Sequence, residues 1–439
     1  MAYFSKAGAK VQQKFDIRKY FVKKSAFIVI FLFCWTSLFA QTHTRVFNEN
    51  IRTLRVARDV LTLEEQEPLQ ISFDEMSHDV RMYSYTVQSL EFRGERLEVN
   101  HSLLSSEYLQ GFTTADITNY EHSINTSREY THYWFEFPNE DMRLTKSGNY
   151  RLTIYEDGNP DNKVAEVDFC VVEPMVKIGA KVRANTDIEF NGRYQQVDVE
   201  VNISEALRVN SDEWKVVVTQ NNRLDNAVVL TKPTYIEPKR LRYINNKDLI
   251  FEGGNEYHHF DAFSCFYAGV GIDRVYHEMG DYHALLFPTE IARGEYSHEF
   301  DSNGRYVVNA ERTSDVDTEA EYMWVYWMLP VEKPWFDGAL YVGGELFGNE
   351  MSMRNRMQYD NERKCYWLTA LVKQGGYDYQ YWFVPKESRV KSQESRVKTT
   401  TQRVDGSYWQ TENEYAIYVY WRPFGARYDR LVGVSVVKP

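Results

Sequence analysis

The stretch Val197-Asp198-Val199-Glu200-Val201-Asn202-Ile203 alternates apolar and polar side chains at every step. Successive side chains of a β-strand point to opposite faces, so this alternation indicates a strand with one face in a core and the other in solvent. The same period recurs along the chain, most clearly in Trp214–Thr219, Tyr377–Val384 and Tyr415–Trp421. Few segments show the period of an amphipathic helix. The sequence therefore predicts an all-β protein.

The stretch Tyr322–Leu329 is apolar on both faces, which predicts a strand that is covered on both sides. Turn-forming pairs stand between the strand patterns: Asp157-Gly158, Asn191-Gly192, Asn303-Gly304 and Asp405-Gly406. Short strands joined by tight turns are typical of antiparallel sandwiches. We therefore expect tandem antiparallel β-sandwich domains of immunoglobulin-like type.

The segment Lys23–Ala40 has the layout of a secretory signal, with a Lys pair, the apolar run Ala26–Trp35, and small or polar residues up to Ala40. The run is shorter than the roughly 20 apolar residues that cross a bilayer. We expect a cleaved signal peptide and no transmembrane segment in the mature chain. Removing the seven Lys/Arg and the one acid of residues 1–40 takes the formal net charge from −12 to −18. Because phosphate binding depends on Lys and Arg, this acidity disfavours nucleic acid as a partner.

The length of the chain and the positions of its prolines suggest how it is divided into domains. After a signal peptide of residues 1–40, we expect an N-terminal sandwich over 41–172, a central sandwich over 173–330 and a C-terminal sandwich over 331–439, with Pro174 and Pro330 near the boundaries. The mature chain holds three cysteines, Cys170, Cys265 and Cys365, which are far apart and odd in number. We expect buried free thiols rather than a disulfide framework.

Motifs that carry chemistry are missing from the sequence. It has no phosphate-binding Gly-Lys-Ser/Thr and no Gly-x-Ser-x-Gly nucleophile elbow, so we predict no catalytic site, no enzyme activity and no cofactor. His277, Asp281 and His283 are the best metal-ligand group, but the second His of a zinc-protease helix is lacking and no metal site is predicted. A carboxylate pair for glycoside cleavage stays open, because one sequence does not show which of 63 acids converge.

Part of the last unit resembles the early-set sandwich modules that flank starch-active enzymes, through Gly338–Phe347, Tyr366–Leu371 and Gly376–Tyr381. The resemblance implies an early-set-like β-sandwich. Modules of this kind that bind glucan stack sugars on exposed tryptophan. A periplasmic carbohydrate-binding or polysaccharide-processing protein is therefore the alternative function, with Trp335 and Trp367 as sugar-stacking candidates.

A second resemblance runs from about Arg55 to the C-terminus. Its strings, in chain order, are Leu69–Asp74, Glu107–Phe112, Tyr130–Tyr133, Phe137–Met142, Ser147–Tyr150, Glu173-Pro174, Ile178–Ala180, Asn185–Ile188, Tyr194–Val197, Gln220–Asn226, Gly253–Tyr257, Lys373–Gly375, Thr411–Tyr415 and Arg422–Leu431. Together they resemble the periplasmic plug proteins of the type IX secretion translocon. The resemblance implies a non-enzymatic plug that seals the periplasmic opening of a giant outer-membrane β-barrel and dissociates when cargo enters. It also implies a location in the periplasm, at the periplasmic face of the outer membrane.

Turn residues within these strings are candidates for contact with the barrel, because a reversible interface is rich in polar and aromatic contacts. The candidates are Asn185, Asp187, Asn221, Arg223, Asp225, Asn226, Asn255, Glu256, Tyr257, Arg427, Tyr428, Asp429 and Arg430. A purely structural role is the alternative for each of them, since Asn and Asp also hold turns by bonding nearby backbone.

Overall fold

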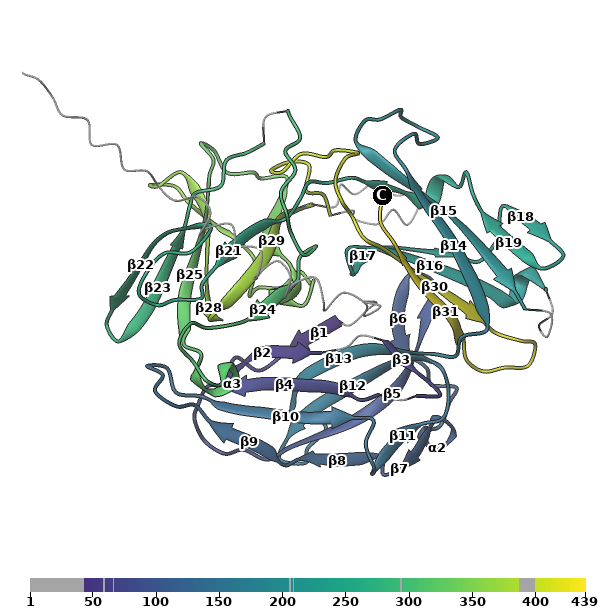
Figure 1. Cartoon of the computed structure of the whole chain (residues 1–439), viewed down its shortest axis with the longest axis horizontal. Helices are drawn as coiled ribbons and strands as arrows, with labels where there is room; N and C mark the ends of the chain where they lie inside the picture. Colours follow the sequence, from purple (N-terminus) through teal and green to yellow (C-terminus); the bar gives the residue numbers. More distant parts are fainter. Residues whose placement is uncertain are drawn as a thin grey trace, which may run out of the picture. The chain divides into compact units, whose positions relative to one another are not determined.

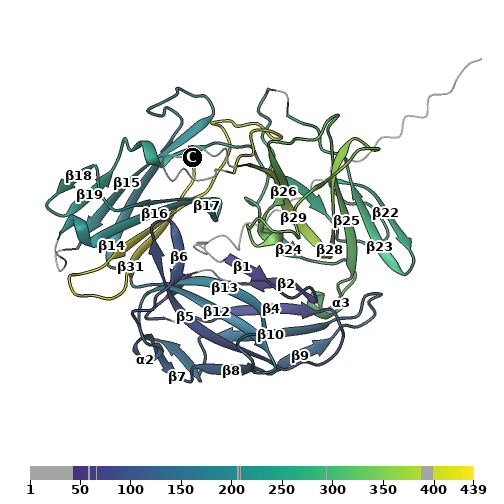
Figure 2. The ribbon, with the colours of Figure 1, turned by 180° about the vertical axis from the view of Figure 1, so that it is seen from behind.

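The computed structural model describes residues 43–439, apart from residues 58–59, 66, 205–206, 208, 293 and 387–398. The expected signal peptide, residues 1–40, lies outside the described residues. The described part is built from strands arranged in mostly antiparallel sheets, which pair into sandwiches (Figures 1 and 2). The predicted all-β fold of tandem sandwiches is confirmed.

The first sandwich is formed by residues 43–172. One sheet has the order β1-β13-β12-β5-β6, with β3 and β8 beside it, and the other has the order β2-β4-β10-β9. In β4, the alternate residues Leu69, Ile71 and Phe73 are fully buried between the sheets, as the period of two requires. The elements are β1 His43–Val46, β2 Ile51–Val56, β3 Val60–Thr62, β4 Leu69–Glu75, β5 Tyr83–Arg93, β6 Arg96–Val99, α2 Ser105–Tyr108, β7 Leu109–Gly111, β8 Thr114–Ile117, β9 Asn119–His122, β10 Thr131–Phe137, β11 Met142–Leu144, β12 Gly148–Glu156 and β13 Lys163–Val172.

The second sandwich combines residues from the middle and the end of the chain. Its first sheet has the order β14-β15-β19-β18, with β20 beside β15, and its second has the order β17-β16-β30-β31. The elements are β14 Val176–Arg183, β15 Tyr194–Ile203, η1 Ser211–Glu213, β16 Trp214–Gln220, β17 Arg223–Leu230, β18 Tyr235–Glu237, β19 Arg240–Tyr243, η2 Lys247–Leu249, β20 Ile250–Glu252, β30 Tyr415–Trp421 and β31 Arg430–Val437.

The third sandwich lies between these two parts of the sequence. One sheet has β29 at its centre, paired with β21, β24 and β26, and the other has the order β22-β23-β25-β28-β27. The elements are β21 His258–Asp261, β22 Ile272–Glu278, β23 Asp281–Leu286, β24 Tyr306–Val308, α3 Val316–Glu319, β25 Tyr322–Pro330, β26 Gly338–Gly343, η3 Glu345–Phe347, β27 Gln358–Asp360, β28 Cys365–Lys373 and β29 Gly375–Pro385.

Strand pairing corrects the expected boundary between residues 330 and 331. β25 pairs with β28 from Tyr322↔Lys373 to Pro330↔Cys365, so the expected boundary would cut one continuous sheet. β30 pairs with β16 from Trp214↔Trp421 to Gln220↔Tyr415, so the C-terminal strands complete the second sandwich and not the third. The alternation of a strand is a local property, whereas its partner depends on contacts across the whole chain. The sequence pattern therefore predicted the strands but not which sandwich the C-terminal strands join.

Two strands that are apolar on both faces have different surroundings. β30 is buried on both faces, because one face contributes Ile417 to the core of the second sandwich and the other packs Tyr418 and Tyr420 against residues of the first sandwich. In β25, alternate residues from Met323 to Leu329 are buried, but Trp324, Tyr326 and Met328 on the outer face are only half-buried. The expected cover on both sides of Tyr322–Leu329 is thus only partial.

Candidate functional site

The candidates Asn185 and Asp187 lie in the exposed loop between β14 and β15. Arg183 holds this loop, since its Nη1 donates to the Asn185 carbonyl at 2.8 Å and its Nη2 to Asp187 Oδ1 at 3.1 Å. Gln196 Nε2 donates to Asp187 Oδ2 at 2.9 Å, and this hydrogen bond is the main cause that lowers the pKa of Asp187. Both candidates therefore hold a loop in place and remain accessible on its surface.

Four further candidates lie on the hairpin of β16 and β17. Asn221 and Asn222 have φ angles of 51° and 54°, the backbone of a two-residue hairpin turn that asparagine tolerates. Asn221 Nδ2 donates to Asn413 Oδ1, and Asn221 Oδ1 accepts from the Glu414 amide, both at 2.8 Å. These bonds attach the hairpin to the segment that leads into β30. Asn221 is buried, with 6% of its surface exposed.

Arg223 and Asp225 form a buried ion pair beside this turn. Arg223 Nε and Nη2 donate to the two carboxylate oxygens of Asp225 at 2.9 and 2.6 Å, and the guanidinium lies 4.3 Å from the ring centroid of Trp382 in the third sandwich. Burial alone would raise the pKa of Asp225, but Arg223 lowers it below its usual value. Asn226 Nδ2 donates to Gln220 Oε1 at 3.1 Å. All four hairpin candidates line a pocket of about 240 Å³ between β17, β20 and the segment before β30.

Asn255, Glu256 and Tyr257 follow β20 and connect the second sandwich to the third. The Asn255 carbonyl accepts from Gln380 Nε2 of β29 at 2.6 Å. Glu256 is buried and accepts from the Tyr296 hydroxyl, and burial raises the pKa of its carboxyl group. Tyr257 is also buried, with 2% of its surface exposed. Glu256 and Tyr257 therefore have little surface free to meet another molecule, whereas Asn255 is half-buried.

The last four candidates, Arg427, Tyr428, Asp429 and Arg430, lie where the C-terminal strands meet the first sandwich. The guanidinium of Arg427 pairs with Glu107, and Tyr428 packs against the core of the first sandwich. Asp429 Oδ2 accepts from Lys215 Nζ at 2.7 Å, and Arg430 Nη2 is 2.7 Å from both oxygens of Glu173. These four residues thus have intramolecular roles at a junction. Contact between any of the candidate residues and a partner stays a prediction.

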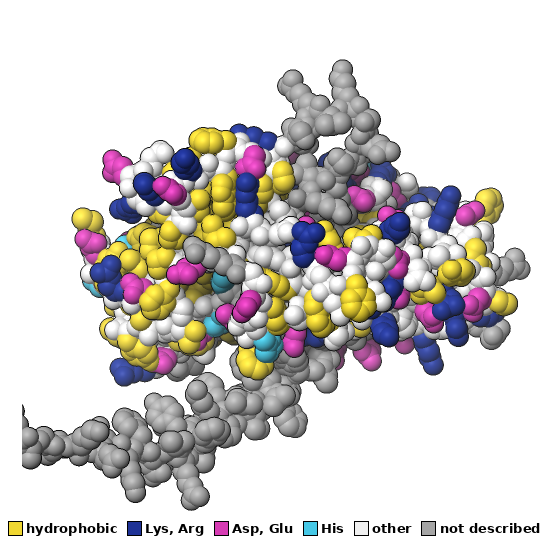
Figure 3. Space-filling view, turned by 90° about the horizontal axis from the view of Figure 1, so that it is seen from above, with side chains coloured by type: hydrophobic (Ala, Val, Ile, Leu, Met, Phe, Trp, Pro, Cys, Tyr) yellow, Lys and Arg dark blue, Asp and Glu magenta, His cyan; other side chains and the backbone are white. Residues whose placement is uncertain are grey.

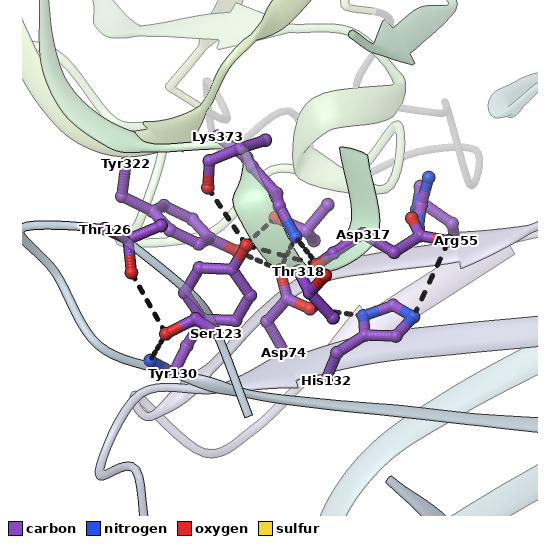
Figure 4. Close-up of polar contacts among 12 residues, drawn as sticks. Arg55, Asp74, Ser123, Thr126, Tyr130, His132, Asp317, Thr318, Tyr322 and Lys373 are labelled. Carbon is purple, nitrogen blue, oxygen red and sulfur yellow. Dashed lines mark hydrogen bonds and ion pairs between the residues drawn. The ribbon is translucent and has the colours of Figure 1, made fainter. Parts of the chain in front are cut away.

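A buried charge cluster joins the first sandwich to the third, and the sequence pattern did not single it out. Figure 4 shows the Lys373 side chain reaching from the end of β28 to Asp74 of β4. Lys373 Nζ donates to Asp74 Oδ2 and to the Asp317 carbonyl, both at 2.7 Å. The side chains of Lys373 and Asp74 are 0% and 1% exposed. Nζ also lies 4.2 Å from the ring centroid of Tyr130.

The other oxygens of the cluster are satisfied by neighbours from both sandwiches. His132 Nδ1 lies 2.6 Å from Asp74 Oδ1, and the Tyr322 hydroxyl donates to Asp74 Oδ2 at 2.7 Å. Arg55 pairs with the carboxylate of Asp317. Asp74, His132 and Lys373 all occur in strings that carry the family resemblance. Their place in these strings was the one sequence signal for the cluster. The sequence does not show that two charged residues 299 positions apart are in contact.

Electrostatics favour the charged form of this cluster. Burial alone would raise the pKa of Asp74, but Lys373 and His132 together lower it to about 2. Burial lowers the pKa of Lys373, and the neighbouring Asp74 carboxylate opposes that shift. A buried charge that loses its partner is strongly destabilising. The first and third sandwiches are therefore held together by an interaction that is costly to break.

A larger pocket lies next to this cluster. It has a volume of about 590 Å³ and is lined by the outer face of β2, β4 and β10 on one side, and by β24, α3 and the η3 region on the other. Trp134 of β10 lines the pocket and is 39% exposed. Pockets of this size take small molecules or peptide segments.

The alternative sugar-stacking candidates differ in accessibility. Trp335 has the Arg403 guanidinium 4.7 Å from its ring centroid and the rings of Tyr366 and Phe383 beside it, so little of its ring is free for stacking. Trp367 is 37% exposed on the outer face of β28.

Two of the three residues considered for a metal, Asp281 and His283, have polar partners within the protein. Asp281 forms a bidentate ion pair with Arg128 at 2.7 Å, and His283 Nδ1 lies 2.9 Å from the Tyr326 hydroxyl. Among the residues that the structure describes, no group of three or more His, Cys, Asp or Glu side chains is placed to hold a metal ion. The three cysteines of the described part, Cys170, Cys265 and Cys365, are buried, and no disulfide joins any two of them.

Comparisons with known proteins agree with this architecture. Residues 43–173 match the model of the type 9 secretion system plug protein first domain. A crystal structure of a hypothetical protein from Parabacteroides merdae is 34% identical in sequence, with a TM-score of 0.84, over 91% of this chain and 100% of that chain. No curated protein matches the chain. In the described part, no helix has the length and apolar character that a membrane crossing requires. The chain belongs to the type IX secretion system plug protein family.

Proposed function

We propose that this protein is a non-enzymatic plug, which seals the periplasmic opening of the outer-membrane translocon of the type IX secretion system and dissociates when cargo enters. Family membership gives a role in type IX secretion, association with the secretion system and a location in the cell envelope. The proposal adds the giant barrel as the direct partner and the periplasmic face of the outer membrane as the place.

The observation that carries the proposal is that each sandwich is bonded to the other two. Lys373 joins the third to the first, and Tyr420, whose hydroxyl donates to Asn149 Oδ1 at 3.0 Å, joins the second to the first. Arg223 stacks on Trp382 to join the second to the third. Outer-membrane barrels reach about 36 strands and enclose wide openings. A body that fills such an opening must resist deformation, and closely packed, cross-bonded sandwiches have low compressibility.

Release requires an interface that is weaker than these internal junctions. A reversible interface combines exposed aromatic residues with polar contacts and avoids a second hydrophobic core. Several large apolar side chains are exposed on loops of the third sandwich, among them Phe266, Tyr267 and Phe287 at 77%, 51% and 57%. Figure 3 shows hydrophobic side chains gathered on the side of this sandwich, at the left of the view. These exposed apolar side chains could contact a partner while the charged side chains on the rest of the surface stay in solvent.

A pull-down from detergent-solubilised outer membrane tests the proposal. The tagged mature chain should recover a very large outer-membrane barrel, and should recover much less of it when cargo is trapped in the translocon. Deleting the gene should make the outer membrane permeable to large antibiotics only while the translocon is present. Leakiness that does not depend on the translocon, or a mature chain that never co-purifies with the barrel, would contradict the proposal.

A further inference from the structure

Two sheet edges open onto the 590 Å³ pocket. β2 is the last strand of its sheet, paired with β4, and β24 is the last strand of its sheet, paired with β29. Both strands contribute residues to the lining, through Leu54–Val56 of β2 and Tyr306–Val308 of β24. The Tyr306 hydroxyl donates to the Leu54 carbonyl at 3.2 Å, so the two edges are held near each other. An unpaired strand edge is a template for another strand.

Hydrogen bonds show which backbone groups of β24 bond to β29 and which point away from it. On β24, the Arg305 carbonyl accepts from Asp378 and the Asn309 amide donates to Gln374, so these odd-numbered positions bond to β29. Bonding positions alternate in antiparallel pairs. The amide and carbonyl groups of Tyr306 and Val308 therefore point away from β29, and within the described residues they have no backbone partner on that side. β24 offers a short row of donors and acceptors.

The same alternation applies to β2. The Ala57 amide donates to the Gln70 carbonyl at 2.9 Å, so the neighbouring Val56 turns its amide and carbonyl away from β4. Asn349 lines the pocket as well. It is 8% exposed, and its Oδ1 accepts no hydrogen bond within the part of the chain that the structure describes. The pocket thus has unused hydrogen-bonding capacity from backbone and side chain.

The charge of the lining favours a cationic occupant. Among the described residues that line the pocket, one carries a guanidinium, Arg55, and five carry a carboxylate: Glu121, Glu136, Asp315, Asp317 and Glu345. Trp134 stacks on His132 with ring centroids 5.7 Å apart, and it lines the pocket with 39% of its surface exposed. A tryptophan face attracts ammonium and guanidinium groups, and nearby carboxylates add to that attraction.

We propose that this pocket binds a short, extended segment of a partner protein of the secretion system, which carries lysine or arginine and pairs with β24 as an added strand. The inference rests on the proposed function, because only that function makes the secretion system the source of the bound segment. The open edge supplies affinity through main-chain hydrogen bonds, as in other cases of strand addition. Trp134 and the surrounding carboxylates supply the preference for a basic side chain.

The test uses the mature full chain, fluorescence anisotropy and designed peptides. The probe is a capped eight-residue peptide in which Lys and Val alternate, compared with the same peptide carrying Glu in place of Lys. We expect binding to the Lys peptide and at least tenfold weaker binding to the Glu peptide. Trp134→Ala should weaken the Lys peptide about tenfold, whereas Trp367→Ala, a matched control at 37% exposure against 39%, should change nothing.

Strand addition has a further signature. Methylating the peptide amides at alternate positions should abolish binding in one register and leave it intact in the other, because only every second amide bonds to the edge. Hydrogen exchange at Tyr306 and Val308 should slow when the Lys peptide binds. Equal binding of Lys and Glu peptides, equal effects of the two methylated registers, or unprotected amides at these positions would overturn the inference. If Trp134→Ala binds the Lys peptide as tightly as the native protein does, while both proteins co-purify with the barrel, the inference is wrong and the proposed plug function stands.

Discussion

Replacing Lys373 by Met removes the buried ammonium that links the first and third sandwiches. In the native protein Nζ donates to Asp74 and to the Asp317 carbonyl, both at 2.7 Å. Removing one member of a buried ion pair costs about 3–5 kcal/mol, because the other charge is left without compensation. Asp74 keeps His132 and the Tyr322 hydroxyl as neighbours. We therefore expect Lys373→Met to lower the free energy of unfolding by about 3 kcal/mol at pH 7, the lower end of that range.

Acid should narrow the difference in the free energy of unfolding between the native protein and Lys373→Met. The pKa of Asp74 in the folded protein is about 2, below its usual 3.8, so its stabilising contribution is present above about pH 4 and is lost as the pH falls toward 2. The shift corresponds to about 2 kcal/mol. In Lys373→Met the main group that lowers this pKa is gone, while burial still raises it. The variant's carboxyl group then protonates more readily, and the variant loses less stability on acidification.

Urea unfolding followed by tryptophan fluorescence, at pH 7 and at about pH 3, measures both effects, because pH 3 lies between the two pKa values of Asp74. Lys333→Met is the control, because Lys333 is exposed and its replacement should stay within about 0.5 kcal/mol of the native protein. The double variant Asp74→Asn/Lys373→Met should recover part of the loss, since neither charge remains. A cost for Lys373→Met below about 1 kcal/mol at pH 7, or a difference that is the same at both pH values, would refute the reasoning.

Three other predictions concern stability. Burial alone would lower the pKa of His259, but two carboxylates raise it to about 9, so its contribution to stability is complete below about pH 6.5 and is lost as the pH rises toward 9. Because the side chain is 35% exposed, we expect this contribution to be about 1 kcal/mol. The melting temperature of the native protein should fall over this pH range and that of His259→Gln should not, and the same pH dependence in both proteins would contradict the prediction. Asn221→Ala should cost about 2–3 kcal/mol in urea unfolding, because it strains a positive φ and leaves buried partners unbonded, whereas Asn221→Gly relieves the strain and should cost less; equal costs would argue against a role for φ. Gly343→Ala places a methyl group 2.0 Å from the Trp382 ring and should cost at least about 1–3 kcal/mol, and a melting temperature equal to that of the native protein would show that the ring moves aside freely.

Local patterns predicted the strands well and their assembly less well. The alternation of Val197–Ile203 lies within β15, and that of Tyr415–Trp421 coincides with β30. One of the two partners of β30, however, is β16, which precedes it by about two hundred residues, and nothing in a period of two identifies a partner.

The candidate residues show the same division between local and distant information. A turn at Asn221 is readable from local chemistry, but its bonds to Asn413 and Glu414 come from a segment that is distant in sequence. Lys373 and Asp74 look like ordinary charged strand ends in the sequence, and charged residues are rarely buried unless they are paired. Only the packing of two sandwiches reveals that each is the partner of the other.

The late arrival of β30 and β31 has a consequence for biogenesis. The sheet started by β16 and β17 is completed by β30 and β31, which follow about two hundred residues later, so it must wait until those two strands have emerged. During that interval the hydrophobic faces of Val216 and Val218 lack their eventual neighbours, and the nascent protein is vulnerable to aggregation and proteolysis. Copies that lack both β30 and β31 should keep this vulnerability permanently, so quality control in the cell would remove them before they could reach a secretion machine.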